Sequence, residues 1–356
     1  MSGATPVTMK HIAAQAGVDR STVSLALRNH PSLPAKTNAR IQHIARQMGY
    51  RPNPLVAALM MHRAKPLGVE PTATIAYVTE LPADQSGLRL RNPVQRAMRQ
   101  GLALRASALG FRIEEFHVGQ AGMSSARISD ILIARGICGI VLGPRTGEKH
   151  EPLHIDWDRF ACVSLGSKYL EEKIDYVCTD HYQNMRLISE RCRQLGYRRI
   201  GLVLRKELSE LLEHRFHSAC LLDQTDQPMG ERCAPLIEPH NLPWPERTVE
   251  WCRAERPDVI VSTISELGQE WLKLAAGLPG RPAVVSVSVE EQNGVIAGIF
   301  QDGAQLGAMA LELVAARVQH NEIGVRPVRR SYLLDGVWVE GISCPPKKPK
   351  ARHKNP

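Results

Sequence analysis

The sequence predicts a small all-α head joined to a larger α/β body. Two observations predict this fold class: a basic N-terminal segment with helix-turn-helix spacing, and a long alternation of apolar strands with helices. The length of 356 residues suits two or three domains, and a hydrophobic fraction of 43% is ordinary for a folded protein. We expect a head at 1–50, a linking segment at 51–66, a body at 67–342 and a disordered tail at 343–356.

The charge of the chain is divided unevenly. Residues 1–65 contain nine Lys and Arg and one acid, Asp19, which gives a net charge of +8. The tail adds +5, so the rest of the chain sums to −4 within a total of +9. A basic head on a mildly acidic body favours a nucleic-acid partner for the head.

The cysteine pattern and the lack of a membrane span or secretory signal predict where the protein resides and whether its thiols are reduced. Its 8 Cys are scattered without a C-x-x-C pair, which indicates reduced core thiols rather than a zinc or disulfide framework. No apolar run reaches the roughly 18 residues of a membrane span, and no secretory signal is recognisable. We therefore expect a cytoplasmic protein without a membrane partner.

Three short helices are predicted in the head. Thr8 is suited to cap a first helix, which Gly17 ends because glycine adopts positive φ without a Cβ clash. Asp19 caps a second helix from Arg20 to about Leu27, and a third runs from about Ala35 to Met48. The short turn between the first two helices is typical of a helix-turn-helix, and Val23 of the second helix is expected to fill the gap between the two.

The order A-G-V-x-x-S-T-V-S followed by G-Y-x-P-N, within residues 7–60, resembles the DNA-binding head and hinge of the lac repressor/galactose repressor family. A looser resemblance continues to residue 342. It implies a sequence-specific transcription regulator that binds a roughly palindromic DNA operator as a homodimer, commonly as a repressor. It also implies a periplasmic-binding-protein-like body of two Rossmann-like lobes.

The resemblance places the second helix in the major groove, with Arg20, Ser21 and Leu25 at base edges. Arg20 can bind guanine O6 and N7. Leu25 departs from the polar or basic residue usual in the family, so it either touches a thymine methyl or packs inward. Phosphate contacts or caps are expected from Thr22, Ser24, Asn29, His30 and Thr37, with Arg28 in either role.

The linking segment resembles the family's hinge. Asn53 can cap a helix from Pro54 to about Met61, which is too short to be stable alone, so we expect it to form only on DNA. Leu59 matches the leucine that family members insert into the minor groove. The alternative is a plain linker. The expected DNA contacts here are Tyr50, Asn53, Val56 (where the family usually has alanine) and Leu59.

The body alternates strands and helices, which predicts parallel sheets covered by helices. Expected strands are 72–79, 111–116, 137–143, 161–166, 176–180, 199–205, 257–263 and 282–289, with helices at 94–110, 124–136 and 182–195. The resemblance implies lobe one at 67–165 plus 301–327 and lobe two at 166–300 plus 328–342. A ligand would bind between the lobes at the carboxyl ends of the strands.

The effector site departs from the sugar-binding pattern of the family. The usual arginine of R-x-x-G-F is Leu212 here and the glycine is Arg215, so no sugar is assigned. An unidentified small-molecule effector remains the expectation, and the candidate residues are Arg145, Asp180, Arg205, Arg215, Ser288 and Asp302. The charged ones fit surface or interlobe salt bridges equally well.

Three alternatives remain open. A regulator of the same fold could respond to a protein partner or to nothing; a small-molecule binding protein would lack DNA readout; and an enzyme would need a catalytic set. The P-loop, dinucleotide, G-x-S-x-G and H-E-x-x-H motifs are all missing. We therefore predict no catalytic residues, no metal site and no cofactor.

Overall fold

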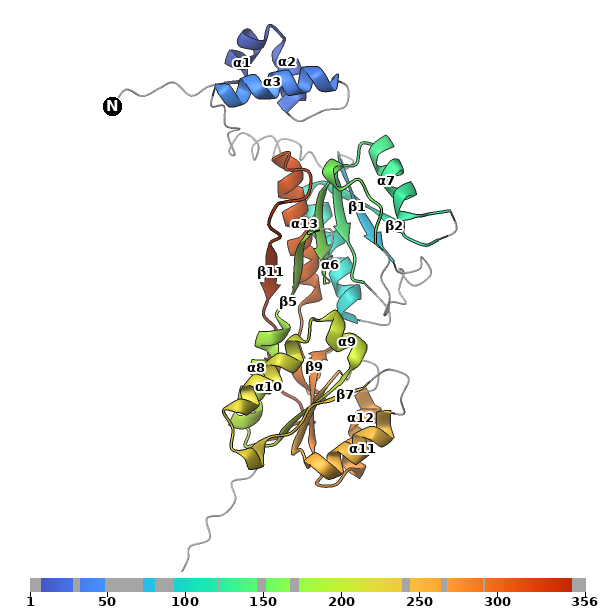
Figure 1. The fold of residues 1–356 in the computed structure, drawn as a ribbon, viewed down its shortest axis with the longest axis vertical. Helices are drawn as coiled ribbons and strands as arrows, with labels where there is room; N and C mark the ends of the chain where they lie inside the picture. Colours follow the sequence, from blue (N-terminus) through green and yellow to red (C-terminus); the bar gives the residue numbers. More distant parts are fainter. Residues whose placement is uncertain are drawn as a thin grey trace, which may run out of the picture.

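The structure is a computed structural model. It describes residues 8–27, 33–48, 73–80, 93–120, 122–145, 152–166, 173–238, 244–263, 268–290 and 292–347. In these ranges the chain forms a helical head and two α/β lobes (Figure 1). The predicted fold class is confirmed.

The head consists of α1 (Met9–Ala16), α2 (Arg20–Leu27) and α3 (Ala35–Gln47). Thr8 precedes α1 in an extended conformation, and its backbone N–H donates to His11 Nδ1. Gly17 ends α1 in the left-handed region at φ 64°, which a residue without Cβ adopts at no steric cost. The helices enclose a small core of Ile12, Ala16, Val23, Ala26, Ile41 and Ala45.

Lobe one contains a six-stranded parallel sheet in the order β11-β5-β4-β3-β1-β2. One face packs against two helices in a core that includes Leu102, Val141 and Leu311, and the other face packs against one helix through Ile128 and Leu132. The strands are β1 (Ala73–Thr79), β2 (Phe111–His117), β3 (Gly139–Leu142), β4 (Ala161–Leu165), β5 (Asp175–Thr179) and β11 (Ser331–Leu334); the helices are α6 (Pro93–Leu109), α13 (Gly303–Gln319) and α7 (Ser125–Ala134).

Lobe two contains a second sheet in the order β12-β10-β9-β8-β6-β7, parallel except for β12 against β10. Its strands are β6 (Ile200–Arg205), β7 (Leu236–Glu238), β8 (Val259–Ser262), β9 (Ala283–Val289), β10 (Ala297–Phe300) and β12 (Val337–Val339). Its helices are α8 (His181–Gln194), α9 (Lys206–Leu211), α10 (Arg215–Thr225), α11 (Trp244–Glu255) and α12 (Gly268–Gly277). Helices α8 and α10 share one core with the sheet, and α11 and α12 contribute to another.

The chain crosses between the lobes at Asp180, at 301–302 and at 335–336. The predicted boundaries after residues 165 and 327 are therefore wrong, because β5 and β11 belong to the sheet of lobe one. The boundaries were misplaced because the pairing of β5 with β4 and β11 joins distant segments, and local sequence does not show such pairing. The β5 strand lies between β4 and β11, and the carboxylate of Asp175 accepts the Arg330 backbone N–H at 2.8 Å.

The first residues of the predicted tail are ordered, so the prediction of disorder from residue 343 is wrong for 343–347. Ser343 and Cys344 are buried, and Lys347 N–H donates to the Leu195 carbonyl at 2.8 Å. The segment is held because its backbone finds partners on lobe two. Residues 348–356 lie outside the described part of the chain.

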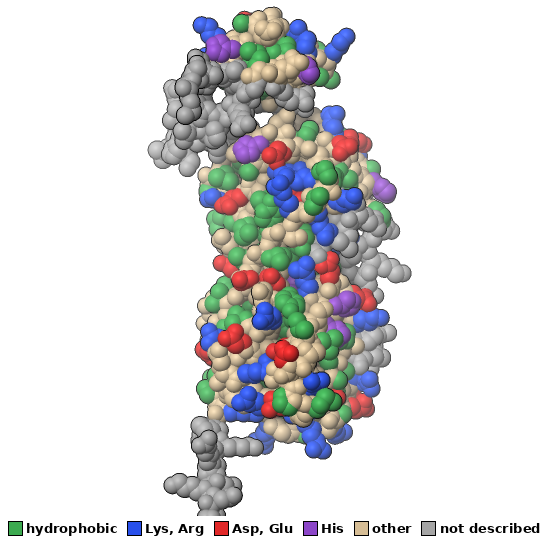
Figure 2. Space-filling view, turned by 60° about the vertical axis from the view of Figure 1, so that its left-hand side comes forward, with side chains coloured by type: hydrophobic (Ala, Val, Ile, Leu, Met, Phe, Trp, Pro, Cys, Tyr) green, Lys and Arg blue, Asp and Glu red, His purple; other side chains and the backbone are tan. Residues whose placement is uncertain are grey.

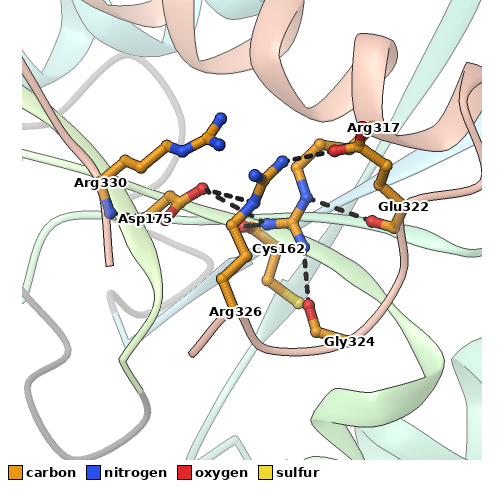
Figure 3. Close-up of polar contacts among 7 residues, drawn as sticks. All are labelled: Cys162, Asp175, Arg317, Glu322, Gly324, Arg326 and Arg330. Carbon is orange, nitrogen blue, oxygen red and sulfur yellow. Dashed lines mark hydrogen bonds and ion pairs between the residues drawn. The ribbon is translucent and has the colours of Figure 1, made fainter. Parts of the chain in front are cut away.

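Buried charge joins the carboxyl end of α13 to the strands of lobe one (Figure 3). The Arg317 guanidinium donates to the carbonyls of Cys162 at 2.8 Å, Glu322 at 3.2 Å and Gly324 at 2.6 Å. Asp175 lies 3.8 Å from Arg317 and 3.3 Å from Arg326. These contacts fix the loop that leads from α13 to β11.

Candidate DNA-binding surface and interlobe site

Helix α2 presents its amino-terminal residues to solvent. Arg20 and Ser21 are exposed, whereas Val23 and Ala26 are buried in the core of the head. A helix held by one face and open at its amino end is arranged as a recognition helix requires. Thr22, Ser24 and Leu25 are half-buried, which leaves both interpretations of Leu25 open.

Helix α3 holds the opposite end of α2 in place. Gln42 Nε2 donates to the Ala26 carbonyl at 2.9 Å, which satisfies an acceptor in the last turn of α2. Sequence reasoning missed Gln42, because a polar residue on an amphipathic helix gives no signal of the carbonyl that it will meet. The bond makes the orientation of α2 depend on α3.

The described surface of the head is cationic. Lys10, Lys36 and Arg40 are exposed together with Arg20, and Asp19 is the acid among the described residues of the head. Thr37 is half-buried in the first turn of α3, where its N–H donates to the Pro34 carbonyl. The remaining predicted DNA contacts lie outside the described residues: Arg28, Asn29, His30, Tyr50, Asn53, Val56 and Leu59.

Between the lobes, the predicted effector residues Asp180 and Asp302 occupy two of the crossings. Each caps a helix: Asp180 Oδ1 accepts the Gln183 N–H at 3.0 Å, and Asp302 Oδ1 accepts the Gln305 N–H at 2.9 Å. Carboxylates engaged in this way stabilise the first turns of α8 and α13. Asp180 and Asp302 therefore act as helix caps in this structure.

The predicted arginines lie at three different elements. Arg145 follows β3, with its Nε 3.9 Å from Glu80 Oε1, and Arg205 ends β6. Arg215 begins α10, and its Nη2 donates to the Tyr176 hydroxyl at 3.2 Å. Because Tyr176 belongs to β5, Arg215 joins lobe two to lobe one. On the face shown in Figure 2, charged side chains of both signs lie along the junction of the lobes.

The turn before Arg215 has an unusual backbone. Glu213 and His214 adopt φ values of 53° and 56°, a region that non-glycine residues rarely enter. The turn is held by a contact of 3.0 Å between Ser209 Oγ and His214 Nδ1. Left-handed residues of this kind cluster at functional sites, where the surrounding structure compensates their cost.

His181, the first residue of α8, was not predicted. Its side chain packs against Phe216 with ring centroids 4.9 Å apart, and its Nδ1 has no hydrogen-bond partner among the described residues. Burial, and then the positive charge of Arg215, lower the pKa of His181 to about 4. The ring is therefore neutral at pH 7, and a charge develops here only in acid.

Gln301 bridges the two sheets at the second crossing and was also not predicted. Its Oε1 accepts the Thr179 hydroxyl at 3.2 Å, and its Nε2 donates to the Val287 carbonyl at 2.9 Å. A side chain bonded to both lobes makes this crossing sensitive to their relative position.

The predicted Ser288 lies beside an internally bonded hydroxyl. Ser286 Oγ donates to the Ser288 carbonyl at 2.7 Å and accepts the Ser288 N–H at 3.1 Å. The hydroxyl of Ser286 is thus engaged within β9. The Ser288 side chain is half-buried.

Neither a metal site nor a membrane span is found among the described ranges. No group of three or more His, Cys, Asp or Glu in these ranges is arranged to hold a metal ion. No helix among the same residues is long and apolar enough to span a membrane.

The head matches the model of a family described as "Bacterial regulatory proteins, lacI family" over residues 8–53. The chain is 25% identical over 203 residues to the maltose regulon regulatory protein MalI of Escherichia coli K12, covering 56% of this chain and 54% of MalI. The chain thus spans about half the length of the curated relatives it matches, which include the regulator CelR of Thermobifida fusca.

Solved structures share the fold over most of the chain. The transcriptional regulator CelR in complex with cellobiose matches with a TM-score of 0.55 at 18% identity, covering 93% of this chain and 98% of that one. The lac repressor dimer bound to operator and the anti-inducer ONPF matches with a TM-score of 0.51 at 17% identity, covering 94% and 98%. The chain therefore matches the lacI family model over residues 8–53, and its body shares the fold of these solved regulators.

Proposed function

We propose that the chain is a sequence-specific DNA-binding transcription regulator, in which α2 is the recognition helix. The observation that carries the proposal is the exposed amino-terminal turn of α2, with Arg20 and Ser21 in a cationic head whose apolar residues form a core. Arg20 contacts guanine in the major groove, and the neighbouring polar residues fix the register on the phosphates.

The regulator acts as a homodimer on a roughly palindromic operator in the bacterial cytoplasm, at the nucleoid. Two heads read two half-sites, so the symmetry of the DNA mirrors that of the protein. The hinge at 51–66 forms a helix on the operator, and Leu59 enters the minor groove at the centre. Repression is the expected output, because it is common in the family.

The hinge proposal is tested with Leu59→Ala in the full chain. Insertion of a leucine between base steps acts at the operator centre and not on random DNA, so the variant should lose operator affinity far more than nonspecific affinity. Binding is measured by fluorescence anisotropy on both duplexes at one salt concentration. Equal losses on the two DNAs would contradict an inserted leucine.

A small-molecule effector bound between the lobes controls DNA binding. Asp180, Gln301 and Arg215 support this proposal, because each lies at a crossing or spans the two lobes. A ligand that binds one lobe arrangement more tightly shifts the population toward it, and with it the spacing of the hinges. The similar CelR was solved with cellobiose, so cellobiose is the first saccharide to test.

The second candidate is a regulator of the same fold that responds to a protein partner or to no ligand. Leu212 stands where sugar-binding relatives have an arginine, and the carboxylates of Asp180 and Asp302 already cap helices. A saccharide site needs several free polar groups, since a buried hydroxyl left unpaired costs about 1–3 kcal/mol.

A thermal-shift screen separates the two candidates. A ligand that binds the folded protein raises the unfolding temperature in proportion to RT ln(1 + [L]/Kd), so a true effector gives a concentration-dependent shift. The screen uses cellobiose and other mono- and disaccharides, then organic acids. Arg215→Gln serves as the matched site variant and should reduce the shift. A library without any shift favours the ligand-independent regulator.

A further inference from the structure

The segment after β12 is bonded to lobe two by both its side chains and its backbone. Ser343 Oγ donates to the Val284 carbonyl at 2.7 Å and accepts the Ala297 N–H at 2.8 Å. The Tyr197 hydroxyl donates to the Pro345 carbonyl at 2.6 Å. Residues 343–347 therefore form a defined strap across the end of α8, which we call the terminal strap.

One cysteine of the terminal strap shares a core with a cysteine of α8. Cys344 is 1% exposed and Cys192, in the last turns of α8, is 0% exposed, and both belong to the same core cluster. Tyr197 lies between them: its N–H donates to the Cys192 carbonyl at 2.9 Å, and its hydroxyl donates to the carbonyl of Pro345, the residue after Cys344. Residues far apart in the chain thus place two thiols in the same part of the lobe-two core, beside Tyr197.

The two thiols are not equivalent. The hydrogen bond from Cys192 lowers the pKa of Cys344, whereas the same contact and burial raise the pKa of Cys192. Burial raises the pKa of Cys220, in the same core, to about 12. Among these three, Cys344 forms a thiolate most readily, and the thiolate is the form that reacts with oxidants.

We propose that Cys192 and Cys344 are an oxidisable pair, which a hydroperoxide converts into an intramolecular disulfide that ties the terminal strap to α8. The Cys344 thiolate attacks one peroxide oxygen, the O–O bond breaks, and the sulfur becomes a sulfenic acid while the other oxygen leaves and is protonated to water (or an alcohol). The Cys192 sulfur then attacks the sulfenic sulfur, its proton leaves with the hydroxyl as water, and the S–S bond forms.

Access to the buried pair comes from opening of the terminal strap. Pro345, Pro346 and Lys347 are exposed, and a short segment near the end of the described chain opens locally at lower cost than the sheet beneath it. Closing the disulfide removes this opening. It also fixes the far end of α8, whose first residue, His181, lies at a crossing between the lobes.

The test treats the folded full chain with hydrogen peroxide, blocks free thiols with an alkylating agent and maps cysteine peptides without reduction. We expect the first disulfide to join Cys192 and Cys344, to lower the mass by two hydrogens and to be reversed by dithiothreitol. Cys220→Ala, which removes another thiol of the same core cluster, should leave its rate unchanged. The oxidised protein should unfold several degrees higher, because the bond closes a long loop.

Variants of the pair give the second readout. Cys192→Ala should stop disulfide formation and leave a sulfenic acid at Cys344 that dimedone traps; Cys344→Ala should show neither product. Disulfide mapping of the unaltered chain tests the proposal without any variant. A folding defect in Cys192→Ala or Cys344→Ala therefore does not decide the outcome. A first disulfide between other cysteines, oxidation confined to the exposed Cys138, or a bond that forms only in denaturant would overturn the proposal.

Discussion

Asp175, the first residue of β5, lies with its Oδ2 3.8 Å from Nη1 of Arg317 on α13, and the side chains are only 3% and 8% exposed. The same carboxylate accepts the Arg330 N–H and pairs with Arg326 (Figure 3). One buried acid thus joins the inner strand β5, the long helix α13 of lobe one and the segment that enters β11. The assignment of β5 and β11 to lobe one depends on contacts of this kind.

Asp175→Ala should destabilise lobe one by about 3–5 kcal/mol, because removal of one partner leaves buried guanidinium charge uncompensated. Hydrogen exchange of the β4 and β5 amides measures the loss where it occurs. Glu250→Ala is the control: its exposed pair with Arg247 should contribute less than about 1 kcal/mol. Equal effects of the two variants would show that the buried network is not a stabilising element.

His181 should make lobe two less stable in mild acid. Its pKa in the folded protein, about 4, lies below the ordinary histidine value of 6.5, so the unfolded chain binds the proton more tightly. This contribution to stability is full above pH 6.5 and is lost as the pH falls toward 4, with a loss of roughly 2 kcal/mol by pH 5.

Urea unfolding at pH values across this window measures the slope. His181→Leu should remove this component, because leucine does not titrate. Phe216→Leu alters the same ring contact but keeps the histidine, so its pH dependence should resemble that of the unaltered protein. An unchanged slope in His181→Leu would contradict the assignment to His181.

The bond between Arg215 and Tyr176 should couple the two lobes. Tyr176→Phe removes only the hydroxyl, so we expect a loss of about 1 kcal/mol in the free energy of unfolding. A double-mutant cycle with Arg215→Met isolates the pair from other contacts of either side chain, including Glu213. Additive single and double effects would mean that the two residues do not interact across the lobes.

Arg20 and Lys36 should affect DNA binding differently. Arg20→Ala removes the proposed base contact, so operator affinity should fall by about 1–3 kcal/mol and preference at one base pair should relax. Lys36→Ala removes an exposed positive charge of the head. Affinity for operator and for random DNA should therefore weaken alike, and the salt dependence should become shallower. Anisotropy titrations at several salt concentrations distinguish the two patterns; identical profiles would remove Arg20 from base readout.

The head could be predicted closely because its signals are local. Apolar residues at helical spacing gave α1, α2 and α3, and the structure places Ile12, Val23 and Ile41 in one core. The turn residue Gly17 also has the positive φ that its position required. Most strands of the body were predicted for the same reason, since buried parallel strands are short continuous apolar runs.

The arrangement of the lobes and the interlobe contacts could not be predicted in this way. Strand order depends on pairing between distant segments, so the apolar run of β5 did not reveal its lobe. Gln301 and His181 are ordinary residues in the sequence, and only the folded chain brings them to the crossings. The basic composition after residue 343 indicated disorder, but the burial of Cys344 against lobe two holds the first residues of that segment.

The most direct test of the central proposal is selection of bound duplexes from a random-sequence pool by the full-length protein at near-physiological salt. The proposal predicts enrichment of a palindrome whose half-sites are separated by a deformable centre, and loss of that enrichment in Arg20→Ala. Binding to all sequences alike, with only salt-dependent affinity and no enriched site, would contradict a sequence-specific dimeric regulator.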